Sequence, residues 1–244
     1  MVDMYYNMNN NTKLFNSFGK MESKITNLQN YIPIYTRFFN FDKNTYNNCN
    51  LNQKYSIKDI KRQYTDTIYN IKIIDNVKKQ TKGRNSFFKY SPILNSIDFM
   101  SGKYRSKKNK NYLELPKLTN NKNCFNKALD INNMAYTDGL FYYLSSMLLN
   151  KYSFYNGIDF YGSFLGIKNN FEMVIDSNEM TYLSESSFFH RNNKKLFHIE
   201  NFEDDELFSN DTRKYRTKLR MVDKGNIEIK FDELDDNKLN SVII

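Results

Sequence analysis

Tryptophan is absent from this chain of 244 residues, and proline, glycine, cysteine and histidine are scarce, at 3, 8, 2 and 2 residues. Cys49 and Cys124 lie far apart and form neither a CxxC motif nor a disulfide framework, so we expect a reducing compartment. His190 and His198 have no cysteine or acid cluster at metal-ligand spacing beside them. These absences argue against a disulfide-stapled domain and against a zinc centre.

Several signature motifs are also missing. The sequence contains no GxGxxG or GxxxxGK[ST] phosphate loop and no GxSxG nucleophile elbow. Gly157, Gly162 and Gly166 lie near one another, but their spacing fits none of these motifs. The polar residues 1–20 contain no apolar h-region, and no run approaches the roughly 18 apolar residues of a membrane span. We therefore expect no signal peptide and no contact with a membrane.

The composition that remains is aromatic and basic. Tyrosine and phenylalanine number 19 and 20, and the net charge is +9 with a pI near 9.2. A positive balance permits binding to nucleic acid, anionic membranes or phosphorylated ligands. The lysines are spread over most of the chain, however, and the richness in Asn, Lys, Tyr, Ile and Phe is typical of an AT-rich genome. Coding bias therefore explains the charge at least as well as a ligand does.

The chain is expected to form an α+β fold in three stretches. Residues 1–29 are polar and unpatterned and are predicted to be a disordered arm. Residues 30–202 are predicted to form the folded domain, with a basic insertion at 101–127. Contact with nucleic acid through 101–127 stays open, although a solvated loop is the simpler interpretation because no aromatic or glycine pattern organises it. Residues 203–244 are predicted to be a charged tail, partly ordered, with one strand at 227–231.

Hydrophobic periodicity places the main elements. The clearest helix covers about 133–150, with Asn132 or Asn133 as its N-cap. The first hairpin is expected to carry a long basic tip at 78–86, and a second, short hairpin follows the helix. The four strands of these hairpins are predicted at 66–75, 86–90, 157–165 and 171–176.

The order of these elements and the amino-acid sequences of several segments resemble a protein-kinase-like family of giant DNA viruses of the mimivirus type. The resemblance is limited to the amino-terminal small lobe of that family. The resemblance covers most of residues 31–202 and is more specific in its second half. The resembling segments are YIPIYTRFFNF at 31–41, FFKYSPILNSIDFMSGKY at 87–104, AYTDGLFYYLSSMLLNKYSFYNGIDFYGSFLGIKNNF at 135–171 and YLSESSFFHRNNKKLFHIE at 182–200.

The resemblance implies a small lobe built of an antiparallel sheet and one main helix, with irregular insertions and flexible tails. It implies that Lys89, on the last strand of the first hairpin, contacts the phosphates of ATP. Asp138 is the acid of the helix that would hold this lysine, and Asp176 would lie at the start of the hinge, its backbone facing the adenine. The alternatives are an edge-strand Lys89 that faces water and an Asp138 that complements the helix dipole.

The departures from the family matter for activity. No HxD…N or DFG motif follows residue 176, and the glycine-rich loop is replaced by a lysine-rich turn. Without the catalytic base and the metal ligands, transition-state charge is not stabilised, so we expect no working enzyme. The chain would be a fragment or a non-catalytic nucleotide- or partner-binding module of a giant virus, in the host cytoplasm or the virion. Its partner would be a separate large-lobe chain or another viral protein. The alternative is a virion-associated structural or interaction protein that binds no nucleotide.

Overall fold

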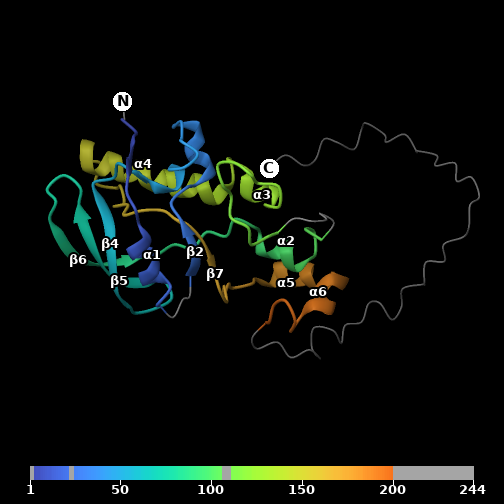
Figure 1. Cartoon of the computed structure of the whole chain (residues 1–244). Coiled ribbons are helices and arrows are strands. Elements are labelled where there is room, and N and C mark those ends of the chain that lie inside the picture. The colour runs from blue at the N-terminus through green and yellow to red at the C-terminus, as the bar shows by residue number, and fades with distance from the viewer. Residues whose placement is uncertain (1–2, 22–24, 106–110, 200–244) are drawn as a thin grey trace, which may run out of the picture. The chain divides into compact units, whose positions relative to one another are not determined.

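The computed structural model describes residues 3–21, 25–105 and 111–199, and these form an α+β fold with three small antiparallel sheets (Figure 1). The α+β class predicted from the sequence is thereby confirmed. The strands are β1 Tyr6–Met8, β2 Ile25–Gln29, β3 Cys49–Leu51, β4 Tyr55–Gln63, β5 Ile68–Asp75, β6 Thr81–Phe87 and β7 Leu165–Lys168. The α-helices are α1 Thr12–Phe18, α2 Ser96–Met100, α3 Asn126–Leu129, α4 Met134–Tyr152, α5 Ser177–Ser184 and α6 Ser187–Asn192, and two 3-10 helices are η1 Pro33–Arg37 and η2 Tyr46–Asn48. The predicted tail at 203–244, with its strand at 227–231, lies outside the described residues.

The largest sheet has the strand order β4-β5-β6, and both of its pairings are antiparallel. This confirms that a hairpin follows the strand predicted at 66–75, but its second strand is β6 and not 86–90, so its basic tip is shorter than expected. The carboxylate of Asp75 accepts hydrogen bonds from the backbone N–H groups of Val77 and Lys78, both at 2.9 Å. This side-chain closure ends the turn early, so β6 begins at Thr81 and most of 78–86 is strand.

One face of this sheet is buried beneath α1. Tyr69, Ile71 and Ile73 alternate along β5 and are fully buried, and Leu14 and Phe18 of α1 belong to the same cluster. The prediction that 1–29 forms a disordered arm is therefore wrong for the described residues of that stretch. Residues four apart share a helix face, and here that face is apolar, a pattern that the surrounding polar residues obscured.

The asparagine run at 9–11 is part of the same ordered segment. Asn11 is buried, and its amide nitrogen donates to the side-chain oxygens of Asn30 at 2.6 Å and Asn50 at 2.8 Å. Asn10 accepts a hydrogen bond from the backbone N–H of Thr12 at 2.9 Å. The asparagine side chain both donates and accepts hydrogen bonds. A run of asparagines can therefore hold the start of an ordered segment in place, and it does not by itself indicate disorder.

The second predicted hairpin, 157–165 with 171–176, is wrong. Among the residues after α4, the strand β7 pairs antiparallel with β2, far away in sequence, and 171–176 forms no strand. Gly166 allows this pairing, because a Cβ there would lie 2.8 Å from a Leu28 methyl carbon and 3.0 Å from one of Ile25. The apolar segment that local alternation assigned to a hairpin pairs instead with β2, a strand far away in sequence.

The long helix α4 confirms the predicted helix within two residues at its carboxyl end. Asn133 is the N-cap, and its side chain accepts a hydrogen bond from the N–H of Ala135 at 3.0 Å. Tyr136, Leu140 and Tyr143 are buried along one face, in a cluster that includes η1 residues. The helix ends at Ser153, whose φ of +55° is left-handed and stops the helical hydrogen bonding.

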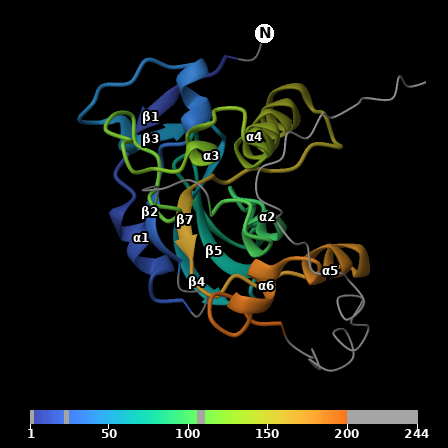
Figure 2. The ribbon, with the colours of Figure 1, turned by 90° about the vertical axis from the view of Figure 1, so that its right-hand side faces the viewer.

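A third apolar cluster joins the short helices that Figure 2 shows gathered together, α2, α5 and α6. Its buried members are Met100, Leu183 and Phe189. The basic insertion predicted at 101–127 partly belongs to the folded core as well, since Cys124 and Phe125 are buried ahead of α3. Its described part is therefore not a plain solvated loop.

Candidate functional site

The candidate site lies where the chain leaves the large sheet and meets α4. Lys89 follows β6 by two residues, so it is not on the strand where the sequence placed it. Its ammonium group lies 2.7 Å from the carboxylate Oδ2 of Asp138, in the second turn of α4. The structure therefore brings together two of the three residues singled out from the sequence, although they are far apart along the chain.

Two further side chains complete this Lys89–Asp138 site. The hydroxyl of Ser91 donates to Asp138 Oδ2 at 3.3 Å. Tyr142 lies one turn after Asp138, with its hydroxyl 3.4 Å from Lys89 Nζ and its ring centroid 5.1 Å from it. The spacing of four residues on a predicted helix could have drawn attention to Tyr142, whereas no sequence signal pointed to Ser91.

The electrostatics of the site keep Lys89 cationic. The hydrogen bond that Lys89 donates to Asp138 raises the pKa of Lys89, desolvation opposes this rise, and the Tyr142 hydroxyl adds to it. The two charged side chains are 46% and 37% exposed. An ion pair this exposed contributes at most about 1 kcal/mol to stability. The ammonium group of Lys89 is thus a solvent-accessible cation whose position is fixed by the carboxylate of Asp138. Such a cation is suited to binding an anion.

Asp176 does not join this site. It is the N-cap of α5, where its side chain accepts from the backbone N–H groups of Asn178 and Glu179, both at 2.8 Å. Glu179 closes the capping box by accepting from the N–H of Asp176 at 3.1 Å. The prediction that Asp176 begins a hinge after a strand is wrong, because its carboxylate and the Glu three residues later begin a helix.

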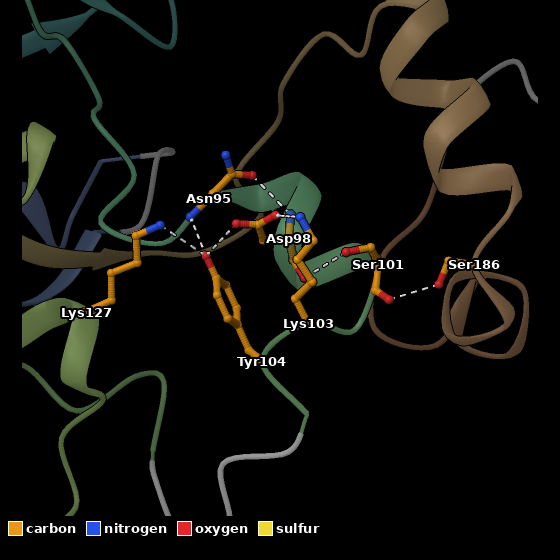
Figure 3. A network of polar contacts seen from close by, with 7 residues as sticks. All are labelled: Asn95, Asp98, Ser101, Lys103, Tyr104, Lys127 and Ser186. Atoms are coloured by element: carbon orange, nitrogen blue, oxygen red, sulfur yellow. Dashed lines mark hydrogen bonds and ion pairs between the residues drawn. The ribbon is translucent and has the colours of Figure 1, made fainter. Parts of the chain in front are cut away.

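A second cluster of a lysine, an aspartate and a tyrosine shares these residue types with the Lys89–Asp138 site and serves as a comparison for it. Lys103 pairs with Asp98 at 2.8 Å (Figure 3). Its ammonium group lies 5.2 Å from the ring centroid of Tyr182. Figure 3 also shows Tyr104 accepting from the backbone N–H of Asn95 at 3.2 Å and from Lys127 Nζ at 3.3 Å. This network binds α2 to the loop that follows it and, through Lys127, to α3.

The same network reaches α6 through the hydroxyl of Ser186, which donates to the Ser101 carbonyl oxygen at 2.9 Å. Two lysines of the predicted basic insertion, Lys103 and Lys127, are therefore occupied by intramolecular contacts. That leaves less of the described insertion available for nucleic acid than the sequence suggested.

Metal and membrane sites receive no support from the described part of the chain. No group of three or more His, Cys, Asp or Glu side chains could hold a metal ion there. Across residues 3–21, 25–105 and 111–199, no helix has both the length and the apolar character to cross a membrane. Lys89 and its neighbours thus remain the candidate site. Comparisons with protein-family models, curated proteins and solved structures find no match to this chain.

Proposed function

We propose that this chain is a non-catalytic, kinase-like binding module that holds a phosphate-bearing ligand, such as a nucleotide, at Lys89. The observation that carries the proposal is the 2.7 Å contact between Lys89 and Asp138, which joins the segment after β6 to α4. In protein kinases a strand lysine contacts the phosphates and is held by an acid of the neighbouring helix. The pairing of these two residues supports a related use here.

The proposal assigns binding and not phosphoryl transfer. The sequence contains no HxD…N or DFG motif to supply a catalytic base and magnesium ligands. In addition, residues 171–176 form no strand, so the strand expected to lead into an adenine-binding hinge is not formed. Phosphate groups, more than the base, are therefore the part of the ligand that this site is expected to recognise.

A thermal-shift titration with ATP and Mg²⁺, ADP and Mg²⁺, adenosine and inorganic phosphate tests the proposal. A ligand at 100 times its Kd stabilises the folded state by about 2.7 kcal/mol, which is a shift of several degrees. Phosphate-bearing ligands should raise the melting temperature and adenosine should not. Lys89→Met should remove the shift, and Asp138→Asn should weaken it because the lysine is no longer held.

Lys103→Met is the matched control, since Lys103 also pairs with an aspartate and lies near a tyrosine ring. It should leave the shift unchanged. The proposal is refuted if no phosphate-bearing ligand raises the melting temperature of the wild-type chain, or if Lys103→Met and Lys89→Met act alike.

A second candidate function, protein–protein interaction, is favoured by the outward face of α4. Met134, Phe141 and Leu148 recur every seven residues on this face and are exposed, as are Tyr152 and Tyr155 at the helix end. Seven-residue apolar spacing is typical of a seam between two packed helices. The helix that matches this spacing is α4 of a second copy, so we propose self-association as the use of this face.

Sedimentation equilibrium tests this second candidate. The wild-type chain should dimerise, and Phe141→Glu should return it to a monomer. Leu113→Glu, a change at an exposed leucine elsewhere, is the control and should leave the dimer intact. A wild-type chain that stays monomeric at high concentration rules out self-association.

A further inference from the structure

The sheet of β4, β5 and β6 is one of two strongly basic stretches of this chain, the other being the insertion at 101–127. Residues 54–87, which hold β4, β5 and β6, carry nine lysines and arginines against three aspartates, a net charge of +6. All three aspartates are occupied: Asp59 pairs with Lys61 at 2.6 Å, Asp66 pairs with Lys168 at 3.1 Å, and Asp75 closes its turn. Coding bias would spread lysine evenly, so this concentration calls for a local reason.

The register of the strands shows which side chains share the face turned away from α1. Directly paired residues point to the same side of a sheet, and Tyr69, Ile71 and Ile73 occupy the buried side. The alternate residues therefore form the outer face. They are Arg62 of β4, Ile68, Asn70 and Lys72 of β5, and Asn85 and Phe87 of β6, with Tyr64 beside Ile68.

The first row of this outer face is apolar and aromatic. Ile68 is paired with Phe87, and the backbone N–H of Tyr64 donates to the Ile68 carbonyl at 2.9 Å. Tyr64 is 51% exposed and Phe87 is 67% exposed. Two rings thus flank an isoleucine, one from β6 and one from the residue just after β4. A solvated aromatic row on a sheet is a platform on which nucleic-acid bases stack.

The second row carries hydrogen-bonding groups. Arg62 is paired with Asn70, and Asn70 is paired with Asn85, whose side-chain oxygen accepts from the Asn70 amide at 2.8 Å. The guanidinium carbon of Arg62 lies 5.3 Å from the ring centroid of Tyr64. Amide and guanidinium groups beside a stacking platform can bond to base edges.

Cations form the border of the platform. Lys72 lies in the next row, and Lys58 and Lys61 occupy the two register shifts of β4 and are exposed. Lys82 and Arg84 of β6 pair with Ile73 and Ile71, so they lie on the opposite face and are not part of this border. The charges of the border attract the phosphate groups of a nucleic-acid strand whose bases lie on the platform. Each phosphate contact then releases a counterion.

We propose that the outer face of β4-β5-β6 binds single-stranded nucleic acid, with Tyr64 and Phe87 stacking on bases and the surrounding lysines and arginines contacting phosphates. A single strand fits better than a duplex, because the faces of duplex bases are already stacked and cannot reach exposed rings. This surface differs from the Lys89–Asp138 site, so it does not depend on the function proposed above.

Fluorescence anisotropy with a labelled oligothymidylate and an oligouridylate of about 16 nucleotides tests the proposal. The wild-type chain should bind both more tightly than it binds a duplex of the same length. Phe87→Leu, which keeps apolar bulk but removes the ring, should weaken binding about tenfold, whereas Phe87→Tyr should retain it. Leu113→Ala, a change at an exposed leucine elsewhere, is the control and should have no effect.

The salt dependence separates phosphate contacts from stacking. Each phosphate contact contributes about −0.7 to the slope of log K against log salt for single strands. The double variant Arg62→Gln/Lys72→Gln should therefore make the slope shallower by about 1.4. Lys13→Gln/Lys20→Gln removes the same charge from exposed positions in and just after α1 and should leave the slope unchanged.

Three results would overturn the proposal. They are absence of binding at low salt, equal affinity for single strand and duplex with no loss in Phe87→Leu, and equal slopes for the two double variants. Tight binding to phosphatidylserine vesicles together with weak binding to the oligonucleotides would also overturn it, and would assign the charged sheet to an anionic membrane surface.

Discussion

Replacing Asn133 by alanine is expected to lower the free energy of unfolding by about 3 kcal/mol. This buried side chain accepts the capping hydrogen bond from Ala135, which contributes about 1 kcal/mol. Its amide nitrogen also donates to the carbonyl oxygens of Ile93 at 3.0 Å and Lys127 at 2.9 Å. Each buried hydrogen bond contributes about 1 kcal/mol. Asn133 therefore both starts α4 and ties two other segments to it.

Asn133→Asp separates these two roles. Aspartate keeps the capping oxygen, and a negative charge at a helix N-terminus is favourable. It loses both donated bonds, however, and brings a carboxylate against the carbonyl oxygens of Ile93 and Lys127. We therefore expect Asn133→Asp to be at least as destabilising as Asn133→Ala.

Urea denaturation followed by circular dichroism measures these differences. Asn132→Ala is the control, because the exposed Asn132 side chain accepts one hydrogen bond, from Arg37. It should change the free energy of unfolding by no more than about 0.5 kcal/mol. If Asn133→Asp were as stable as wild type, capping alone would be the role of this residue and the reasoning from the two donated bonds would be refuted.

Three further predictions concern glycine, cysteine and tyrosine. Gly102→Ala should destabilise by about 2 kcal/mol or more, because φ is +83° and a Cβ would lie 2.6 Å from the Phe188 ring, whereas Gly83→Ala, with open space, should be neutral in the same denaturation assay. Burial raises the pKa of Cys49 to about 12, so its alkylation at pH 8 should be roughly a thousandfold slower in the native chain than in urea, and equal rates would contradict its burial. Burial also raises the pKa of Tyr143 to about 12 from about 10 when unfolded. The stability from its neutral form is complete below pH 10 and lost as pH rises towards 12, so Tyr143→Phe should show a shallower fall in unfolding free energy over that window, and an identical fall would refute the assignment.

Local signals in the sequence were sufficient for the central elements. Alternating branched residues located β5, and helical spacing with an asparagine cap located α4. Both elements follow from short-range preferences that the surrounding structure reinforces. Segments with weaker local preference were misassigned, including α1, hidden among polar residues, and 171–176, which paired with nothing.

The sequence also named Lys89 and Asp138 as partners, by resemblance to the order of elements in a kinase small lobe, and their contact at 2.7 Å agrees with that pairing. It missed Ser91, and it placed Asp176 in a hinge, where the structure has a helix cap. The aromatic and basic outer face of the large sheet was also not predicted from the sequence. Its rows combine residues from three strands, and strand register is visible in the paired structure alone.

Composition and periodicity by themselves determined the α+β class, the position of α4, the hairpin of β5 and β6, and the absence of familiar catalytic motifs. Tertiary structure decided which strand β7 joins, which of two adjacent asparagines caps α4, and which side chains share the outer face of the large sheet. The physical reason is the range of the interactions. Helix and hairpin signals act over a few residues, whereas sheet pairing, burial and ion pairs depend on segments that meet only when the chain has folded.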